Sequence, residues 1–175
     1  MKTSEPKLFL LAILVLMILG VSSASACVCG GSNIPRTLRE RVNGAVALSA
    51  SVFTGKVVAF EYRKGIRNEY MESQRAAGQT VEYETMVARF EVDRWWKRDL
   101  PAVTYMITQV TRNSDGTASH NSCDYNFKLG EKYLVYASGN NDELATHKCS
   151  RTATATQASA DLEILGEGFR PIEPK

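Results

Sequence analysis

The sequence predicts a mainly β protein, a small closed or partly open barrel of about five antiparallel strands with helices at its ends. Three observations support this prediction. Short segments rich in β-branched and aromatic residues recur along the chain. Gly, Asn, Asp and Pro separate these segments. Helical spacing of apolar residues occurs only before the first segment and after the last one.

Residues 1–26 are expected to be a secretory signal peptide. Two lysines lie in the first seven residues, an unbroken apolar run covers 8–21, and small residues fill 22–26. The apolar run is too short for an ordinary membrane-spanning helix, which needs about 20 residues. Cleavage after this leader would leave 27–175 as one domain of ordinary size, with a free α-amino group on Cys27.

A short helix is predicted within 30–51. Pro35 is acceptable at a first helical position. Leu38, Val42 and Ala45 then follow at spacings of four and three, which places them on one face of a helix.

Five segments are predicted to be strands, the last of them short. They are 52–60, 83–93, 103–110, 132–137 and 144–148. Gly55 is a candidate β-bulge in the first strand. The second strand alternates clearly, with Thr85, Arg89, Glu91 and Asp93 mostly on one face and Met86, Ala88, Phe90 and Val92 on the other. Residues 61–80 are polar and are expected to form a long exposed excursion.

A second helix is predicted after Cys149. The apolar stripe of this helix ends at Gly166, and its members are Ala155, Ala158, Leu162 and Leu165. The tail 167–175 contains two prolines and is expected to be irregular.

Charge argues against a protein built mainly to bind nucleic acid or anionic membranes. The leader holds two of the 21 basic and one of the 19 acidic side chains, which leaves 19 and 18 in the exported part. Trp95-Trp96, flanked by basic residues, could form a base-stacking platform. Packing of one of these rings under the barrel rim is the preferred interpretation.

The four cysteines, at positions 27, 29, 123 and 149, predict a disulfide framework. A bridge from Cys27 to Cys29 would close a very small, strained ring. Two long-range pairings remain, and either one ties the start of the exported chain to its second half. We therefore expect the first residues to be held rather than frayed.

The sequence gives no sign of an enzyme. It contains no Ser-His-Asp order, no glycine-rich phosphate loop and no pair of acids typical of catalysis. His120 and His147 are the only histidines, neither has a second ligand at zinc spacing, and both are expected at the surface. Tyr133, Val135 and Ala137 are expected in the core.

Several of these segments together resemble the inhibitory N-terminal domain of the tissue inhibitors of metalloproteinases, a netrin-type module. The resemblance runs from Cys27 to about Gly166. It is carried by the Cys-Val-Cys start, the segments SVFTGKVV and FEVDRWWKR, the block 123–137, and the segment CSRT ahead of the last helix. The animal inhibitors have a third bridge and a cysteine-rich second subdomain, which this chain lacks. Gly30 and Gly31 stand where that family more often has bulkier contact residues.

The resemblance implies a five-stranded OB-type barrel with flanking α-helices. It pairs Cys27 with Cys123 and Cys29 with Cys149. In the family, the amine and carbonyl of the first cysteine bind the active-site zinc of a metalloprotease, a role that falls here on Cys27.

The resemblance also implies the remaining protease contacts. Val28 would enter the pocket beside the zinc, and Asn121-Ser122, just before Cys123, would complete the contact ridge. The expected function is a secreted or periplasmic inhibitor, monomeric and without a cofactor, whose partner is a zinc metalloprotease.

The main alternative is an extracytoplasmic binding or adhesion module on the same barrel, without inhibitory activity. Lipidation at Cys27 would anchor it to a membrane as a lipoprotein and block the amine. Ala24 lies three residues earlier, where lipoprotein signals usually carry a larger aliphatic residue.

Overall fold

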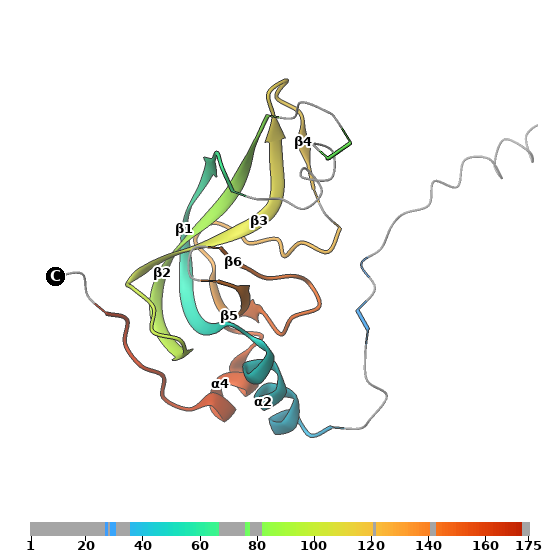
Figure 1. The fold of residues 1–175 in the computed structure, drawn as a ribbon. Helices are drawn as coiled ribbons and strands as arrows, with labels where there is room; N and C mark the ends of the chain where they lie inside the picture. Colours follow the sequence, from blue (N-terminus) through green and yellow to red (C-terminus); the bar gives the residue numbers. More distant parts are fainter. Residues whose placement is uncertain are drawn as a thin grey trace, which may run out of the picture.

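The computed structural model describes residues 27, 29–30, 36–66, 76–77, 82–120, 122–140 and 143–172. Within them, five strands form a closed barrel in the order β1-β2-β3-β6-β5, and β5 pairs back with β1 (Figure 1). The barrel strands are β1 (Ser51–Arg63), β2 (Tyr83–Lys97), β3 (Val103–Asn113), β5 (Lys132–Gly139) and β6 (Leu144–Ala145). The predicted fold class is confirmed.

Two short strands and two helices complete the described part. Strand β4 (Ala118–Ser119) pairs with β3, and β7 (Ala153–Thr154) pairs with β5. Helices α2 (Leu38–Leu48) and α4 (Ser159–Leu165) lie beside each other at one end of the barrel (Figure 1). Neither helix is long and apolar enough to cross a membrane, and the same holds for the rest of the described residues.

The expectation of an entirely antiparallel order is wrong at one pair, because β6 runs parallel to β3. The physical reason is the odd number of barrel strands. Alternating directions cannot be completed around a closed ring of five, so one neighbouring pair must be parallel. The two-residue β6 bears that pair, and all the other pairings are antiparallel.

Predicted strand boundaries also shift, and β2, β3 and β5 extend past their predicted ends to Lys97, Asn113 and Gly139. Strand β1 continues three residues into the segment expected to be an exposed excursion, because 60–63 pair with β2. Most of that excursion, 67–75 and 78–80, lies outside the described residues. The last barrel strand covers only two of the five residues predicted for it.

Side chains from alternate faces of the strands form two buried clusters. The first lies inside the barrel and includes Phe53, Phe90, Met106, Tyr133 and Val135. Aromatic pairs there meet edge to face, with ring centroids 5.6 Å apart for Phe53 and Phe90. Burial of Tyr133, Val135 and Ala137 confirms their predicted place in the core.

The second cluster joins the outer face of the barrel to the helices. Its buried members are Val52, Leu134, Tyr136 and Ala158, with Leu162 and Leu165 packed against them. These residues alternate with the barrel interior along β1 and β5, so one strand pair serves both clusters.

Local sequence explains where the helices begin and end. Thr37 and Glu40 form a capping box at the start of α2. At the far end of α4, Gly166 has a φ of 69°, a conformation that glycine adopts without penalty. Helix α4 begins later than its apolar stripe suggested, because the Ala155 N–H donates to the Lys132 carbonyl at 2.8 Å and holds that residue on the sheet.

The second strand is bulged, and one predicted side chain faces the other way. Thr85 is fully buried, although the alternation placed it on the polar face. A register shift between Thr85 and Val87 interrupts the pairing with β3 and accounts for the change of face.

Candidate functional site

The candidate site is the segment that contains Cys27 and Cys29, which two disulfides attach to the barrel. Cys27 is bonded to Cys123 and Cys29 to Cys149, the pairing that the resemblance implied. These bridges join residues 96 and 120 positions apart. Cys27 and Cys29, which have one residue between them, are therefore bonded to two separate loops.

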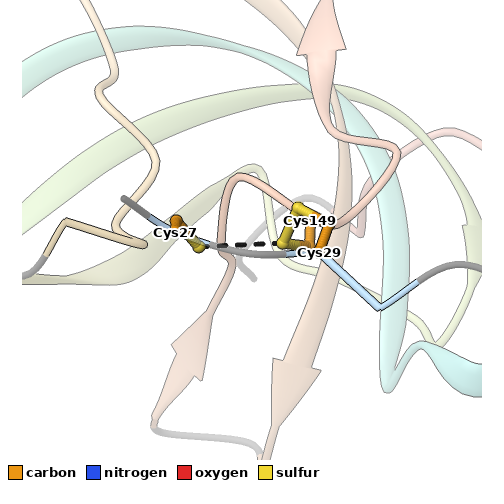
Figure 2. Close-up of side chains that lie close together, drawn as sticks. All are labelled: Cys27, Cys29 and Cys149. Carbon is orange, nitrogen blue, oxygen red and sulfur yellow. Dashed lines mark hydrogen bonds between the residues drawn. A yellow bond between two sulfur atoms is a disulfide. The ribbon is translucent and has the colours of Figure 1, made fainter. Parts of the chain in front are cut away.

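The side chain of Cys27 lies beside the bridge between Cys29 and Cys149 (Figure 2). The Sγ atoms of Cys27 and Cys149 are 3.7 Å apart, and the three sulfurs of Cys27, Cys29 and Cys149 lie within 4.8 Å of one another. Since every cysteine is in a disulfide, neither sulfur of the 3.7 Å pair carries a proton, and the approach is a van der Waals contact. The same bonding leaves no thiolate for a metal, so the sulfur cluster is not a metal site in this oxidised state.

The two anchoring loops are joined to each other. Lys148 donates its backbone N–H to the Cys123 carbonyl at 2.9 Å and its ammonium group to the Ser122 carbonyl at 2.8 Å. Asp124 and His147 form a β-bridge beside these contacts. Because both loops belong to one hydrogen-bonded unit, the two disulfides hold the terminal segment on a common base.

His147 shapes the second anchor from within. It is exposed, as predicted, and its Nδ1 accepts a hydrogen bond from the backbone N–H of Cys149 at 3.2 Å. The Ser150 N–H donates to the His147 carbonyl at 2.9 Å, which closes the turn that presents the cysteine. The spacing of His147 from other possible zinc ligands does not predict its hydrogen bond to Cys149.

A buried polar network fixes the end of the same turn to β5 and α4. The Thr146 hydroxyl donates to the Tyr136 carbonyl at 3.0 Å. Asp161, only 5% exposed, accepts two bonds from the Arg151 guanidinium, at 2.6 and 2.9 Å, and one from the Tyr136 hydroxyl at 3.0 Å. The acid is therefore both paired and hydrogen-bonded, which a buried charge requires.

Burial raises the pKa of Tyr136, and the neighbouring Asp161 carboxylate raises it further. The phenol therefore stays protonated and keeps donating to the acid. This network stiffens the strand from which the turn around Cys149 departs.

A small cavity lies beside the second bridge. It has a volume of about 200 Å³ and separates the end of α2 from the turn that carries the cysteine. The described residues lining it include Leu48, Ser49, His147, Cys149 and Arg151. Leu48 is 89% exposed, so the rim of the cavity is apolar on the helix side.

The structure places only part of the predicted contact ridge. Ser122 is exposed and adjoins Cys123, whose Cα lies 4.8 Å from that of Cys27. Val28 and Asn121 lie outside the described residues. A Cβ atom added at Gly30 would meet none of the described residues within 4 Å.

The tryptophan pair is engaged in packing rather than displayed. Trp95 belongs to the inner cluster and Trp96 to the outer one, whereas the sequence analysis placed a single ring under the rim. Phe169 stacks on Trp95 with ring centroids 4.6 Å apart. The indole N–H of Trp96 donates to the Gly166 carbonyl at the end of α4, and that of Trp95 to the Arg170 carbonyl in the tail, at 3.0 Å each.

No known protein-family model matches this chain, and no curated protein matches it. The two disulfides of the barrel indicate an oxidising, extracytoplasmic environment.

Proposed function

We propose that this chain is an exported inhibitor of zinc metalloproteases, in which the α-amino and carbonyl groups of Cys27 bind the zinc of the target. The observation that carries the proposal is the attachment of Cys27 and Cys29 to two joined loops. A chelating residue needs such support, since an unrestrained chain terminus loses much of its affinity to the entropy of ordering.

The chemistry of the target supports the same role. A catalytic zinc has three protein ligands and an open position that normally holds water. An amine and a carbonyl on one residue can displace this water and bind the metal together. The amine titrates near 7.7–8.0, so its neutral form is accessible at neutral pH. The chain then contributes no catalytic residue and needs no cofactor.

The proposal places Val28 in the protease pocket beside the zinc and Ser122 on the flank of the contact ridge. Ser122 is exposed and its carbonyl is held by Lys148, so this part of the ridge is a fixed surface. No described residue lies within 4 Å of a Cβ position at Gly30, which is consistent with room for a partner on that side of Cys29.

The experiment compares three forms of the mature protein: one beginning at Cys27, one with an alanine added before Cys27, and one with an alanine added after Lys175. Each is assayed against a panel of zinc proteases with fluorogenic peptides. The first and third forms are expected to inhibit the same target equally. The second is expected to inhibit at least 100-fold less, because its terminal amine is displaced from the metal.

Peptide mapping of the disulfides and circular dichroism serve as controls that all three forms share one fold. Equal inhibition by the N-terminally extended form would exclude zinc binding by the amine. An intact mass that includes acyl chains on Cys27 in the native product would instead favour the lipid-anchored binding module.

A further inference from the structure

A second cavity lies beside the turn that joins β2 to β3, formed by residues other than those of the disulfide cluster. Its volume is about 600 Å³, within the range of small-molecule sites. The guanidinium-bearing residues Arg63 and Arg98 line it together with the ring of Tyr105. Leu100, Pro101 and Val103 supply an apolar wall.

Arg98 has a backbone conformation that its side chain does not favour. Its φ is 67°, and every other described residue with a positive φ is a glycine. Glycine would adopt this conformation without steric cost, whereas in an arginine the Cβ atom makes it sterically unfavourable. Backbone strain of this kind is concentrated at functional sites, where surrounding structure maintains it.

The side chain of the same residue is also unsatisfied. The Nη1 atom of Arg98 is buried and has no hydrogen-bond partner in the described structure. A buried N–H group without a hydrogen-bond partner carries the cost of its lost hydration. Two unfavourable features thus coincide at one residue on the cavity wall.

The neighbouring strands add further cationic groups. The Arg63 guanidinium lies 3.8 Å from the centre of the Tyr105 ring and is held there by Glu61 at 2.8 Å. Arg89 is the cross-strand partner of Tyr105, and its Nε is likewise buried without a partner. Among the described charged residues that line the cavity, there are two arginines and one acid, the exposed Asp99.

We propose that this cavity binds a small anionic ligand through an oxyanion group, which accepts hydrogen bonds from Arg98 and lies near Arg63. Arginine presents a planar set of donors that matches the oxygens of a carboxylate, phosphate or sulfate. The apolar wall then contacts the remainder of the ligand. Occupation of the cavity accounts for the retention of a strained arginine on its wall. The inference is independent of metalloprotease inhibition.

Titrations with inorganic phosphate and with acetate, followed by NMR at constant ionic strength, test the proposal. The wild-type protein is expected to show saturable shifts at residues around Arg98 with at least one of the two anions. Saturation by phosphate alone identifies a tetrahedral oxyanion, and saturation by acetate identifies a carboxylate. Shifts that rise linearly without saturation for both anions would overturn the proposal.

Two variants and a control sharpen the test. Arg98→Gln is expected to weaken binding at least tenfold, whereas Arg41→Gln, which removes the same charge from an exposed position on α2, should leave binding unchanged. Arg98→Gly is expected to abolish binding and to melt at a higher temperature than the wild type, because it relieves the strain. Undiminished affinity in Arg98→Gln, saturable binding in Arg98→Gly, or a lower melting temperature in Arg98→Gly would contradict the assignment.

Discussion

Gly55 shows how one residue permits two strands to approach. It sits at a register shift between β1 and β2, which confirms the bulge predicted at this glycine. A Cβ atom placed there would lie 2.6 Å from the Glu91 carbonyl oxygen. The obstacle is backbone, so it cannot swing aside as a flexible side chain would.

Gly55→Ala is therefore expected to lower the free energy of unfolding by about 2 kcal/mol, through overpacking between the strands. Urea denaturation measures the effect. Gly44→Ala is the matched control, since Gly44 is inside α2 with nothing nearer to its Cβ position than 4.0 Å. That change should raise stability by about 0.5–1 kcal/mol, and equal effects of the two substitutions would contradict the steric account.

Tyr136 makes the free energy of unfolding depend on pH in the alkaline range. Burial, and then the Asp161 carboxylate, raise the pKa of this phenol in the folded protein, while the unfolded chain titrates near 10. The folded state thus holds its proton where the unfolded state has lost it. The contribution of Tyr136 to stability is therefore fully present below about pH 10 and is lost as the pH rises toward the pKa of the folded state.

Tyr136→Phe is expected to flatten this alkaline loss by up to about 1.4 kcal/mol per pH unit. Urea unfolding between pH 8 and 11.5 measures the slope. Some slope should remain, because burial also raises the pKa of Tyr125 and Tyr133. The variant should be less stable at pH 8 by about 1 kcal/mol, owing to the lost bond to Asp161. A slope identical to that of the wild type would exclude Tyr136 as the source.

At the scale of elements, helix α2 depends on a side chain from a distant strand. It has no basic residue in its last turn. Lys97, at the end of β2, instead donates to the carbonyls of Val46 and Ala47 at 2.8 and 2.9 Å. A cation at the C-terminal end of a helix satisfies free carbonyls and complements the helix dipole.

Lys97→Met is expected to destabilise the protein by about 1–2 kcal/mol, because it removes two charge-assisted hydrogen bonds while keeping the aliphatic stem. Lys128→Met, at an exposed position, is the control and should change stability by less than about 0.5 kcal/mol. Thermal unfolding followed by circular dichroism separates them. If the two variants have the same melting temperature, the hydrogen bonds of Lys97 do not stabilise the helix.

The sequence predicted those elements that local patterns determine. Alternation located β2, the apolar spacing after Pro35 located α2, and Gly166 marked the end of α4. Parallel pairing of the short β6 could not be read locally, because it follows from closing a ring of five strands. The cysteines of the candidate site were recognisable by their number and spacing. The strained Arg98 of the second cavity was not recognisable, since no sequence pattern indicates a buried N–H group without a partner.

The C-terminal tail illustrates an arrangement at the scale of the whole molecule. It was expected to be irregular, yet Phe169 and Trp95 exchange backbone hydrogen bonds at 2.8 and 2.9 Å, and their rings stack. The tail thereby covers β2 beyond Glu91, where its pairing with β3 ends.

Phe169→Ala is expected to cost about 1 kcal/mol and to shift tryptophan emission to longer wavelength, because the stacked ring leaves Trp95 to water. Leu129→Ala is a suitable control, since Leu129 is exposed to a similar degree, 64% against 62% for Phe169. Emission spectra and urea unfolding of the two variants provide the comparison. An unchanged spectrum in Phe169→Ala would show that the tail does not shield the indole.

The contact between the two disulfides predicts how the molecule responds when one bridge is opened. In Cys123→Ser, the thiol of Cys27 is freed 3.7 Å from the Cys149 sulfur. Its thiolate can attack that sulfur, forming a bond from Cys27 to Cys149 and releasing Cys29 as thiolate, with no external oxidant. The old and new bridges span 120 and 122 positions. Loop entropy therefore favours neither product.

The Cys123→Ser protein is accordingly expected to contain both bridges in amounts within about tenfold of each other, because only local geometry distinguishes them. Alkylation at low pH, followed by peptide mapping, shows whether Cys27 or Cys29 carries the label. Cys27→Ser is the matched variant, since it removes the attacking sulfur and should retain the original bridge between Cys29 and Cys149. If only Cys27 is labelled in Cys123→Ser, the neighbouring bridges do not exchange, and the terminal segment is held by two independent attachments.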